Sequence, residues 1–256
     1  LCVESTYGNR AHRSFADTCD ELAEALRRTL KVDGGNVIIP AFAVGRTQEL
    51  LFVLADLVRA GRIDRLDVVV DSPMASAVTE LTVRHDDLWD DETRELYAWT
   101  RHHADRFNLR FVQDVEESMA LNSVRGGLVI ISASGMCDAG RIKHHLRYNL
   151  GRRNAHVVFV GYQAEGTLGR RLVDGAQWVR IHGRDYRVNA QRHTVGGLSA
   201  HTDQQGLLEW YGHFQPAPPL VLVHGEDKAR EALAGEIGER YGAPVELARP
   251  GMVLDV

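Results

Sequence analysis

Residues 37–46 read Val37-Ile38-Ile39-Pro40-Ala41-Phe42-Ala43-Val44-Gly45-Arg46, an apolar run followed by a turn of small residues and an arginine. A short apolar run bounded by turn residues is typical of a strand buried on both faces. The residues that follow predict a helix from about Thr47 to Ala60. Strand, loop and helix in this order indicate an α/β fold with a mostly parallel sheet flanked by helices.

The same pattern recurs along the chain. It predicts further buried strands at Leu66 to Val70, Leu128 to Ser132 and Val157 to Val160, and a mostly helical charged segment from Ser76 to Arg106. Each strand ends in a loop rich in Gly, Ser or Pro. Ligands bind at such strand ends in open α/β sheets, so these loops are candidate binding sites.

The pattern changes after about Gln177. Residues 178–188 alternate around a central turn, which predicts an antiparallel hairpin. A helix from Asp203 to about Phe214, a strand from Leu220 to Val223, a helix from Glu226 to Tyr241 and a short terminal strand then form a second unit. The chain opens at Leu1-Cys2-Val3, which we interpret as the middle of a strand, and its first methionine is Met74. We therefore interpret the sequence as a fragment.

Composition narrows the class of protein. The 256 residues are 44% hydrophobic and 25% charged, as in an ordinary globular protein. The net charge of −5 gives no overall attraction for nucleic acid, so a polyanion site would have to be a local basic patch. No membrane span or signal peptide is visible. Three widely spaced cysteines, Cys2, Cys19 and Cys137, favour the cytoplasm and argue against a zinc finger.

Two histidines lie in small-residue turns at the edges of expected elements. His201 lies in Gly197-Leu198-Ser199-Ala200-His201-Thr202-Asp203, and His224 directly follows the strand that ends at Val223. Neutral imidazole is a common zinc ligand, but zinc needs three or four ligands, and the chain contains no H-x-H-x-D-H cluster. Taken alone, each histidine has a structural explanation. Thr202 with Gln205, for example, fits a capping box that needs no imidazole.

Glu4 directly follows an apolar strand end, in Glu4-Ser5-Thr6-Tyr7-Gly8. A carboxylate in this position could orient an imidazole and favour its protonated, acidic form. A solvated glutamate in a surface turn explains the same residue.

Three strand-end loops could cradle phosphates: Phe42 to Arg46, Ser132 to Met136 and Gly161 to Thr167. Each alone is weak evidence, and together they favour a phosphodiester or nucleotide ligand. The most basic stretch, Arg141 to Arg147, could follow a nucleic-acid backbone or could be a solvated helix face.

Several of these segments together resemble the β-CASP branch of the metallo-β-lactamase superfamily, a group of RNA-processing nucleases. The segments, in the family's order, are Glu4-Ser5-Thr6-Tyr7-Gly8, residues 40–49, Ser134-Gly135-Met136, residues 161–168, Ser199-Ala200-His201-Thr202-Asp203 and Val223-His224-Gly225-Glu226. The resemblance covers nearly the whole chain. It implies a β-CASP domain at residues 9–176, inserted into a metallo-β-lactamase αβ/βα fold of which residues 1–8 and 177–256 are the final pieces.

The resemblance also implies roles for individual residues. Glu4 and His201 form the catalytic pair that protonates the leaving group, and His224 is a zinc ligand. Arg46, Ser134, Gly135, Met136 and Ser199 are expected to bind the RNA substrate. The implied function is hydrolysis of RNA phosphodiester bonds with two Zn²⁺ ions.

One departure from the family is large, because the H-x-H-x-D-H cluster and the other metal ligands precede Glu4 in the family and are absent here. We therefore expect the intact parent to be a cytoplasmic metal-dependent ribonuclease, and this fragment alone to hold little or no zinc and to be inactive. RNA is the expected partner, no membrane is expected, and a homodimer is left open. Two alternatives remain, an inactive RNA-binding scaffold subunit and a DNA-processing nuclease of the same superfamily. A nucleotide-binding α/β protein is disfavoured, because the sequence lacks both phosphate-loop fingerprints.

Overall fold

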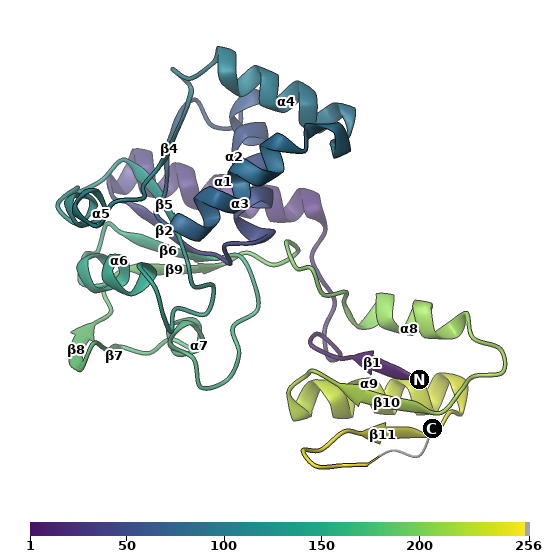
Figure 1. The fold of residues 1–256 in the computed structure, drawn as a ribbon. Helices are drawn as coiled ribbons and strands as arrows, with labels where there is room; N and C mark the ends of the chain where they lie inside the picture. Colours follow the sequence, from purple (N-terminus) through teal and green to yellow (C-terminus); the bar gives the residue numbers. More distant parts are fainter. Residues whose placement is uncertain (254–256) are drawn as a thin grey trace. The chain divides into compact units, whose positions relative to one another are not determined.

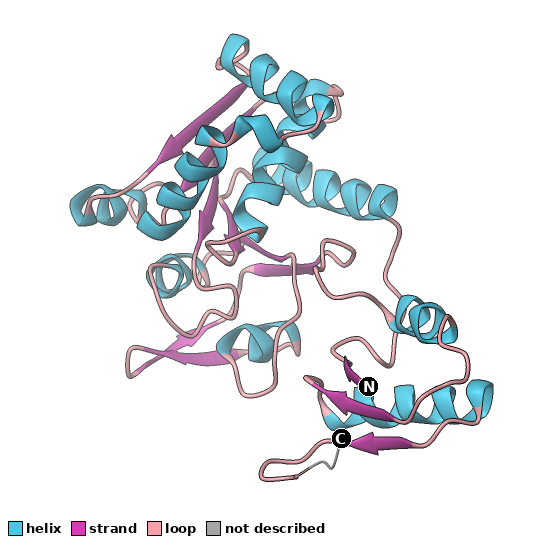
Figure 2. Ribbon diagram, turned by 45° about the vertical axis from the view of Figure 1, so that its right-hand side comes forward, coloured by secondary structure: helices cyan, strands magenta, loops and turns pink. Residues whose placement is uncertain are grey.

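The computed structural model describes residues 1–253, which form two compact units (Figures 1 and 2). The larger unit is Phe15–Leu198, and the smaller joins Leu1–Ser14 to the chain from Ser199 onward. Among the described residues, no helix is both long enough and apolar enough to cross a membrane.

A six-stranded parallel sheet organises the larger unit. Its strands lie in the order β4-β3-β5-β2-β6-β9, and every neighbouring pair is parallel. The bounds are β2 Val37–Pro40, β3 Leu66–Val70, β4 Phe107–Phe111, β5 Leu128–Ser132, β6 His156–Phe159 and β9 Gln191–Thr194. The predicted α/β class with a mostly parallel sheet is confirmed.

Helices cover both faces of this sheet. Because side chains alternate along a strand, Val37 and Ile39 face one core and Ile38 faces the other. The first core is shared with α1 (Phe15–Arg27), α2 (Arg46–Arg59), α3 (Pro73–Arg84) and α4 (Asp91–His102). The second is shared with α6 (Ile142–Asn149) and α7 (Leu168–Val173), while Leu121 of α5 (Val115–Leu121) packs with Val69. Two short helical turns, Arg28–Asp33 and Asp86–Leu88, complete the unit.

The predicted hairpin consists of β7 (Trp178–Ile181) and β8 (Arg184–Arg187), which pair in antiparallel register. Its two-residue turn, His182-Gly183, has positive φ at both positions, as a tight hairpin with right-handed strand twist requires. Val179 and Ile181 bury the inner face against the same core as α6.

The smaller unit is a three-stranded parallel sheet in the order β1-β10-β11. Its strands are β1 (Cys2–Glu4), β10 (Leu220–Val223) and β11 (Val245–Leu247), and two helices, α8 (Gln204–Gly212) and α9 (Asp227–Tyr241), share its core. Leu208 and Tyr211 of α8 and Leu233 and Ile237 of α9 pack with Leu220 and Leu222 of the central strand. The sheet depends on joining the first residues of the chain to a strand far along the sequence.

The predicted strand at Leu66 to Val70 is correct to the residue, and the one predicted at Val157 to Val160 is β6 shifted by one residue. β9 reads Gln-Arg-His-Thr, carries no apolar pattern and was missed. The expectation that the charged segment from Ser76 to Arg106 is mostly helical is confirmed: α3 and α4 cover most of it, divided by a turn at Asp86–Leu88.

The predicted family boundaries at residues 8/9 and 176/177 were drawn by resemblance and stay predictions. By contacts, the hairpin and β9 group with the larger unit, because β9 pairs with β6.

A buried carboxylate ties α6 to the sheet. Asp71, at the end of β3, is fully buried and receives hydrogen bonds from Ser118 Oγ at 2.6 Å and Arg141 Nη1 at 2.7 Å. His145 Nε2, also fully buried, lies 2.5 Å from Asp71 Oδ2. Burial alone would raise the pKa of Asp71, but the hydrogen bonds from His145, Ser118 and Arg141 outweigh it and hold that pKa below its usual range. Arg141 and His145 therefore point inward and are not part of a basic helix face.

Replacing this carboxylate should destabilise the larger unit. In Asp71→Asn, Arg141 loses its charge partner, so we expect the free energy of unfolding to fall by about 3 kcal/mol or more at neutral pH. Because the folded-state pKa of Asp71 is lowered, its stabilising contribution is present above the unfolded pKa of about 4 and is lost as pH falls further.

Urea unfolding of the wild type and Asp71→Asn between neutral and acidic pH measures this loss of stability. The difference between their free energies of unfolding should narrow below about pH 4. A difference that stays constant across that range would contradict the assignment. Asp105→Asn, at an exposed position between α4 and β4, is a control for the loss of one negative charge.

Candidate functional site

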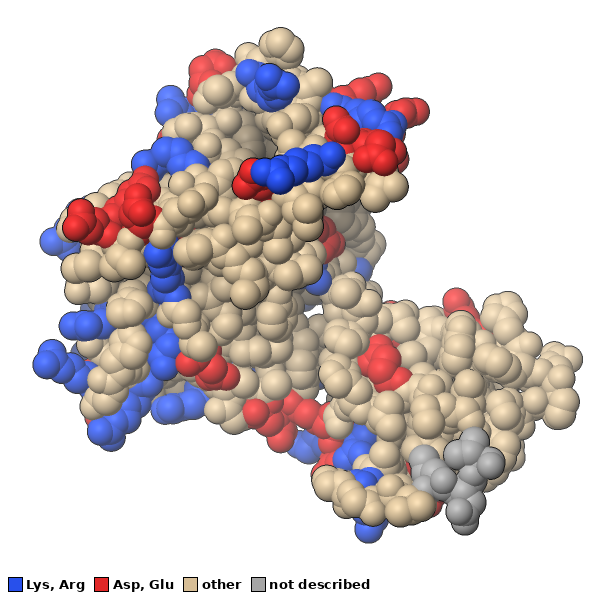
Figure 3. Space-filling view, in the orientation of Figure 1, with Lys and Arg blue, Asp and Glu red and all other residues tan. Residues whose placement is uncertain are grey.

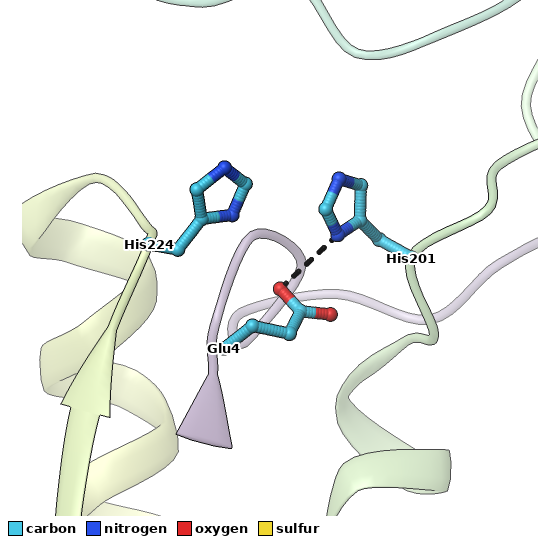
Figure 4. Close-up of side chains that lie close together, drawn as sticks. All are labelled: Glu4, His201 and His224. Carbon is cyan, nitrogen blue, oxygen red and sulfur yellow. Dashed lines mark ion pairs between the residues drawn. The ribbon is translucent and has the colours of Figure 1, made fainter. Parts of the chain in front are cut away.

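Parallel pairing brings Glu4 and His224 to the same edge of the smaller sheet. β1 and β10 are hydrogen-bonded with Glu4 opposite Val223. Glu4, the last residue of β1, and His224, the residue after β10, therefore both lie at the carboxyl end of the sheet. His201 comes from the loop before α8. Figure 4 shows the three side chains converging from these three segments.

The three side chains are close enough to act together. His201 Nδ1 lies 3.4 Å from Glu4 Oε2, and the rings of His201 and His224 are stacked with centroids 5.1 Å apart and planes inclined by 23°. All three remain accessible, with 39% of the His201 side chain and 29% of the Glu4 side chain exposed. The sequence-predicted catalytic pair and the predicted zinc ligand therefore form one cluster.

Thr6, which the sequence reasoning did not single out, lies between the two imidazoles. Its Oγ1 is 3.1 Å from His224 Nδ1 and 3.4 Å from His201 Nδ1, and its hydroxyl donates to the His224 carbonyl oxygen at 3.2 Å. A hydroxyl has one proton; when Thr6 donates it to the carbonyl, Oγ1 accepts hydrogen bonds from ring N–H groups, and when Thr6 donates it to a ring nitrogen, that nitrogen accepts. The first arrangement places the Nδ1 proton on each neutral imidazole and leaves each Nε2 with a lone pair.

In that arrangement a role can be assigned to the outward nitrogen, Nε2, of each ring. In Figure 4 one nitrogen of each ring faces the loop that carries Glu4 and the other is directed away from it. The outward Nε2 of a neutral His224 could ligate a metal, and the outward Nε2 of a protonated His201 could donate a proton. The single signal for Thr6 in the sequence was its place in the Glu4-Ser5-Thr6 motif.

Backbone contacts fix the three segments in place. Glu4 Oε2 accepts a hydrogen bond from the Thr6 backbone N–H at 2.7 Å, which orients the carboxylate. Ser5 Oγ donates to the Val223 carbonyl at 2.8 Å, and a side chain at Gly225 would collide with Ser5. His224 itself has φ of 47°, in the left-handed region that costs a non-glycine residue free energy.

The loop that carries His201 is held by a different cap from the one expected. Asp203, not Thr202, caps α8: its Oδ1 accepts from the Gly206 N–H at 2.9 Å and its Oδ2 accepts from the His12 N–H at 2.9 Å. Burial alone would raise the pKa of Asp203, but these backbone hydrogen bonds outweigh it and lower that pKa. The capping box proposed for Thr202 and Gln205 is therefore wrong.

The cluster is suited to a zinc ion in the type of its donors. Among residues 1–253, Glu4, His201 and His224 are the one group of three such side chains whose ligand atoms all lie within 4.8 Å of one another. Imidazole nitrogen and carboxylate oxygen are common zinc ligands. Three donors are one fewer than a closed zinc site uses, and Glu4 and His201 are already paired with each other.

The predicted substrate residues fall in both units. Ser199, in the smaller unit, accepts a hydrogen bond from the His201 N–H at 3.2 Å, so it supports the histidine loop. Arg46, in the larger unit, begins α2 and pairs with Glu49, with 11% of its side chain exposed. Their role in binding substrate stays a prediction.

The loop Ser134-Gly135-Met136 is braced by the neighbouring loop of the larger unit. Gln163 Nε2 donates to the Gly135 carbonyl at 3.0 Å, and the Met136 carbonyl accepts from the Gly169 N–H at 3.0 Å. A side chain at Gly135 would meet the ring of Phe42, which is half exposed. Two of the three candidate phosphate loops thus form one ordered surface.

Taken with the parallel α/β fold, the paired imidazoles and carboxylate define a metallohydrolase-like site. Family comparisons are specific: residues 47–172 match the Beta-Casp domain and residues 185–248 match the Zn-dependent metallo-hydrolase RNA specificity domain. The chain belongs to the β-CASP family of the metallo-β-lactamase superfamily.

Curated relatives extend the similarity over nearly the whole chain. Ribonuclease TTHA0252 of Thermus thermophilus is 40% identical over 251 residues, which are 98% of this chain and 57% of the relative. Transcription termination factor FttA is 32% identical in Methanothermobacter thermautotrophicus and 31% in Pyrococcus abyssi, over 94% of this chain and 39% and 38% of those proteins. The chain thus spans between about two fifths and three fifths of the length of these relatives.

Removing the Thr6 hydroxyl tests its role in orienting the rings. In Thr6→Val we expect the neutral imidazole of His224 to lose its fixed tautomer, because its Nδ1 then faces no hydroxyl, whereas His201 Nδ1 keeps Glu4 Oε2 as a neighbour. The ¹⁵N shifts of histidine-labelled chain at mildly alkaline pH report the tautomer directly. Thr6→Ser keeps the oxygen and should retain the wild-type shifts. Unchanged shifts in Thr6→Val would show that Thr6 does not set the tautomer.

Proposed function

We propose that this chain forms part of a zinc-dependent ribonuclease, in which it supplies one metal ligand and the acid that protonates the leaving group. The observation that carries the proposal is the Thr6-ordered pair of imidazoles beside Glu4. The names of the relatives and the RNA specificity domain favour RNA over DNA as substrate. The cytoplasmic location and the homodimer stay predictions.

In this proposal the two histidines have different functions. His224 holds zinc through its outward Nε2, since Thr6 Oγ1 occupies the other ring nitrogen. Bound zinc supplies Lewis-acid stabilisation of phosphoryl charge and a water of lowered pKa. His201, whose Nδ1 lies 3.4 Å from Glu4 Oε2 and is oriented by that carboxylate, donates a proton from its outward Nε2 to the departing ribose oxygen.

Zinc binding by the chain alone separates the two roles. We propose that the chain alone holds zinc weakly, because His224 is the one committed ligand and Glu4 and His201 are paired. In zinc titrations by calorimetry, His224→Ala should abolish what binding there is, and His201→Ala should leave it within about threefold. Two tightly bound zinc ions per chain, or an equal loss in both variants, would contradict this division. Exposed His85→Ala is a matched control.

Cleavage of RNA by the full-length product of the gene tests whether His201 is the general acid. His201→Ala should lower kcat by about 10²- to 10⁴-fold with zinc content unchanged, the range for loss of a general acid. A substrate whose departing ribose oxygen is replaced by sulfur needs no proton on the leaving group, so it should restore cleavage by His201→Ala.

The same substrate should not rescue His224→Ala, whose defect lies in metal binding. Absence of rescue in His201→Ala would overturn the acid assignment. Full-length protein that binds RNA without cleaving it would instead support the inactive scaffold, and preferential cleavage of DNA would support the other alternative.

A further inference from the structure

The outer surface of the β7–β8 hairpin and the exposed side of α6 form one basic face of the larger unit. We call it the hairpin–α6 face and define it by the following side chains: Lys143, His144, Arg147 and Tyr148 from α6, and Trp178, Arg180, His182 and Arg187 from the hairpin. None of these residues belongs to the Glu4, His201 and His224 cluster, which lies in the smaller unit. In Figure 3, Lys and Arg side chains gather over α6, β7 and β8 at the lower left.

Two sets of contacts join the hairpin and α6 into one surface. At the tip, the rings of His144 and His182 lie 4.7 Å apart. Burial and the neighbouring His182 lower the pKa of His144, so the His144 ring is uncharged near neutral pH. Beneath, Val179 and Ile181 share a core with Ile142 and Leu146 of α6. The outward side chains are therefore held on a rigid base.

The positive charge of this face is not neutralised within the chain. Among residues 1–253, none of the cations of the face, Lys143, Arg147, Arg180 and Arg187, forms an ion pair. The hairpin strands carry a single carboxylate, Asp185, directly opposite Arg180. A local excess of positive charge on a chain of net charge −5 indicates a polyanionic partner.

Exposed aromatic side chains lie among these cations. Trp178 is 58% exposed and stands directly opposite Arg187 across the hairpin, on its outward face. Tyr148 is 43% exposed, and the guanidinium of Arg147 lies 5.3 Å from its ring centroid. Cations that contact phosphates, alternating with aromatic rings on which bases stack, are how proteins bind single-stranded nucleic acid without reading its sequence. An acidic peptide would use the charges but would leave the rings without a function.

We propose that the hairpin–α6 face binds single-stranded RNA, with Arg180 and Arg187 on the phosphates and Trp178 stacked on a base. The choice of RNA over DNA as the ligand rests on the proposed ribonuclease function. The assignment of the binding surface does not depend on that function. In this arrangement the chain holds a strand of RNA on residues separate from those that perform the chemistry.

Fluorescence anisotropy of the 256-residue chain with a labelled oligouridine of about 12 nucleotides, in EDTA, tests the proposal. Arg180→Gln/Arg187→Gln should weaken binding about tenfold and lower the salt slope of log K by about 1.4, since each phosphate contact on a single strand contributes about 0.7. Arg84→Gln/Arg101→Gln removes the same charge from exposed positions in α3 and α4 and should leave the slope unchanged. Equal effects of the two double variants would overturn the proposal.

Two further measurements distinguish loss of a contact from misfolding: a variant that should bind more tightly, and a ligand that has no bases. Asp185→Asn removes the one carboxylate of the hairpin and should strengthen binding about twofold. Trp178→Ala should weaken binding about fivefold or more, and Trp178→Phe should retain most of it. On an abasic ribose-phosphate oligomer, Trp178→Ala should equal the wild type. Loss of binding on both ligands, or polyglutamate binding as tightly as RNA, would overturn RNA stacking in favour of a general polyanion site.

Cleavage by the full-length product of the gene and oligonucleotide binding by the chain separate this inference from the proposed function. If the full-length product of the gene proves unable to cleave RNA while the hairpin variants still lose binding, the proposed function fails and the inference stands. If cleavage depends on His201 but the hairpin variants bind normally, the inference fails and the proposed function stands.

Discussion

The candidate site depends on the parallel pairing of β1 with β10. Three residues near the start of the chain hydrogen-bond with a strand 219 positions further along, Cys2 beside Val221 and Glu4 beside Val223. The pairing is held by a shared apolar core, in which Val3 packs with Leu222 and Leu233. Because parallel strands end at the same edge, Glu4 and His224 emerge together, and Thr6 on the next turn reaches both imidazoles. Nothing in either segment alone holds an imidazole in a defined tautomer.

Elements with an apolar pattern could be predicted from the sequence, and elements without one could not. β3, β5 and β10 are buried runs of Val, Ile and Leu, and their predicted ranges match the structure. β9 is made of Gln191, Arg192, His193 and Thr194 and forms because β6 offers an unpaired edge beside it. That edge exists only once the other strands have assembled, so the sequence of β9 alone does not predict a strand.

The candidate site shows the same limit at the level of single residues. Glu4, His201 and His224 were predicted by motif, and the structure brings them together. Thr6 was not, because its importance arises from contacts with residues about 200 positions away. The basic stretch from Arg141 to Arg147, by contrast, is a pattern that the sequence suggested and the structure separates. Arg141 and His145 bind the buried Asp71, whereas Arg147 faces solvent. Periodicity along α6 could not assign these faces without knowing where Asp71 lies.

A His-Gly pair occurs at two turns of the chain and serves a different purpose in each. His182-Gly183 and His224-Gly225 both follow an apolar strand, and both histidines have φ of 47°, a conformation that costs a non-glycine residue about 1 kcal/mol or more. At His182 the strained position closes a hairpin and places its ring beside that of His144, with the two planes inclined by 40°. At His224 it turns the ring toward Thr6 and His201. Asparagine would satisfy the backbone in either turn, so the imidazole must be explained by its neighbours. The imidazole at the hairpin tip contributes a ring contact, whereas the one held by a hydroxyl beside a carboxylate-paired imidazole can present a nitrogen lone pair for chemistry.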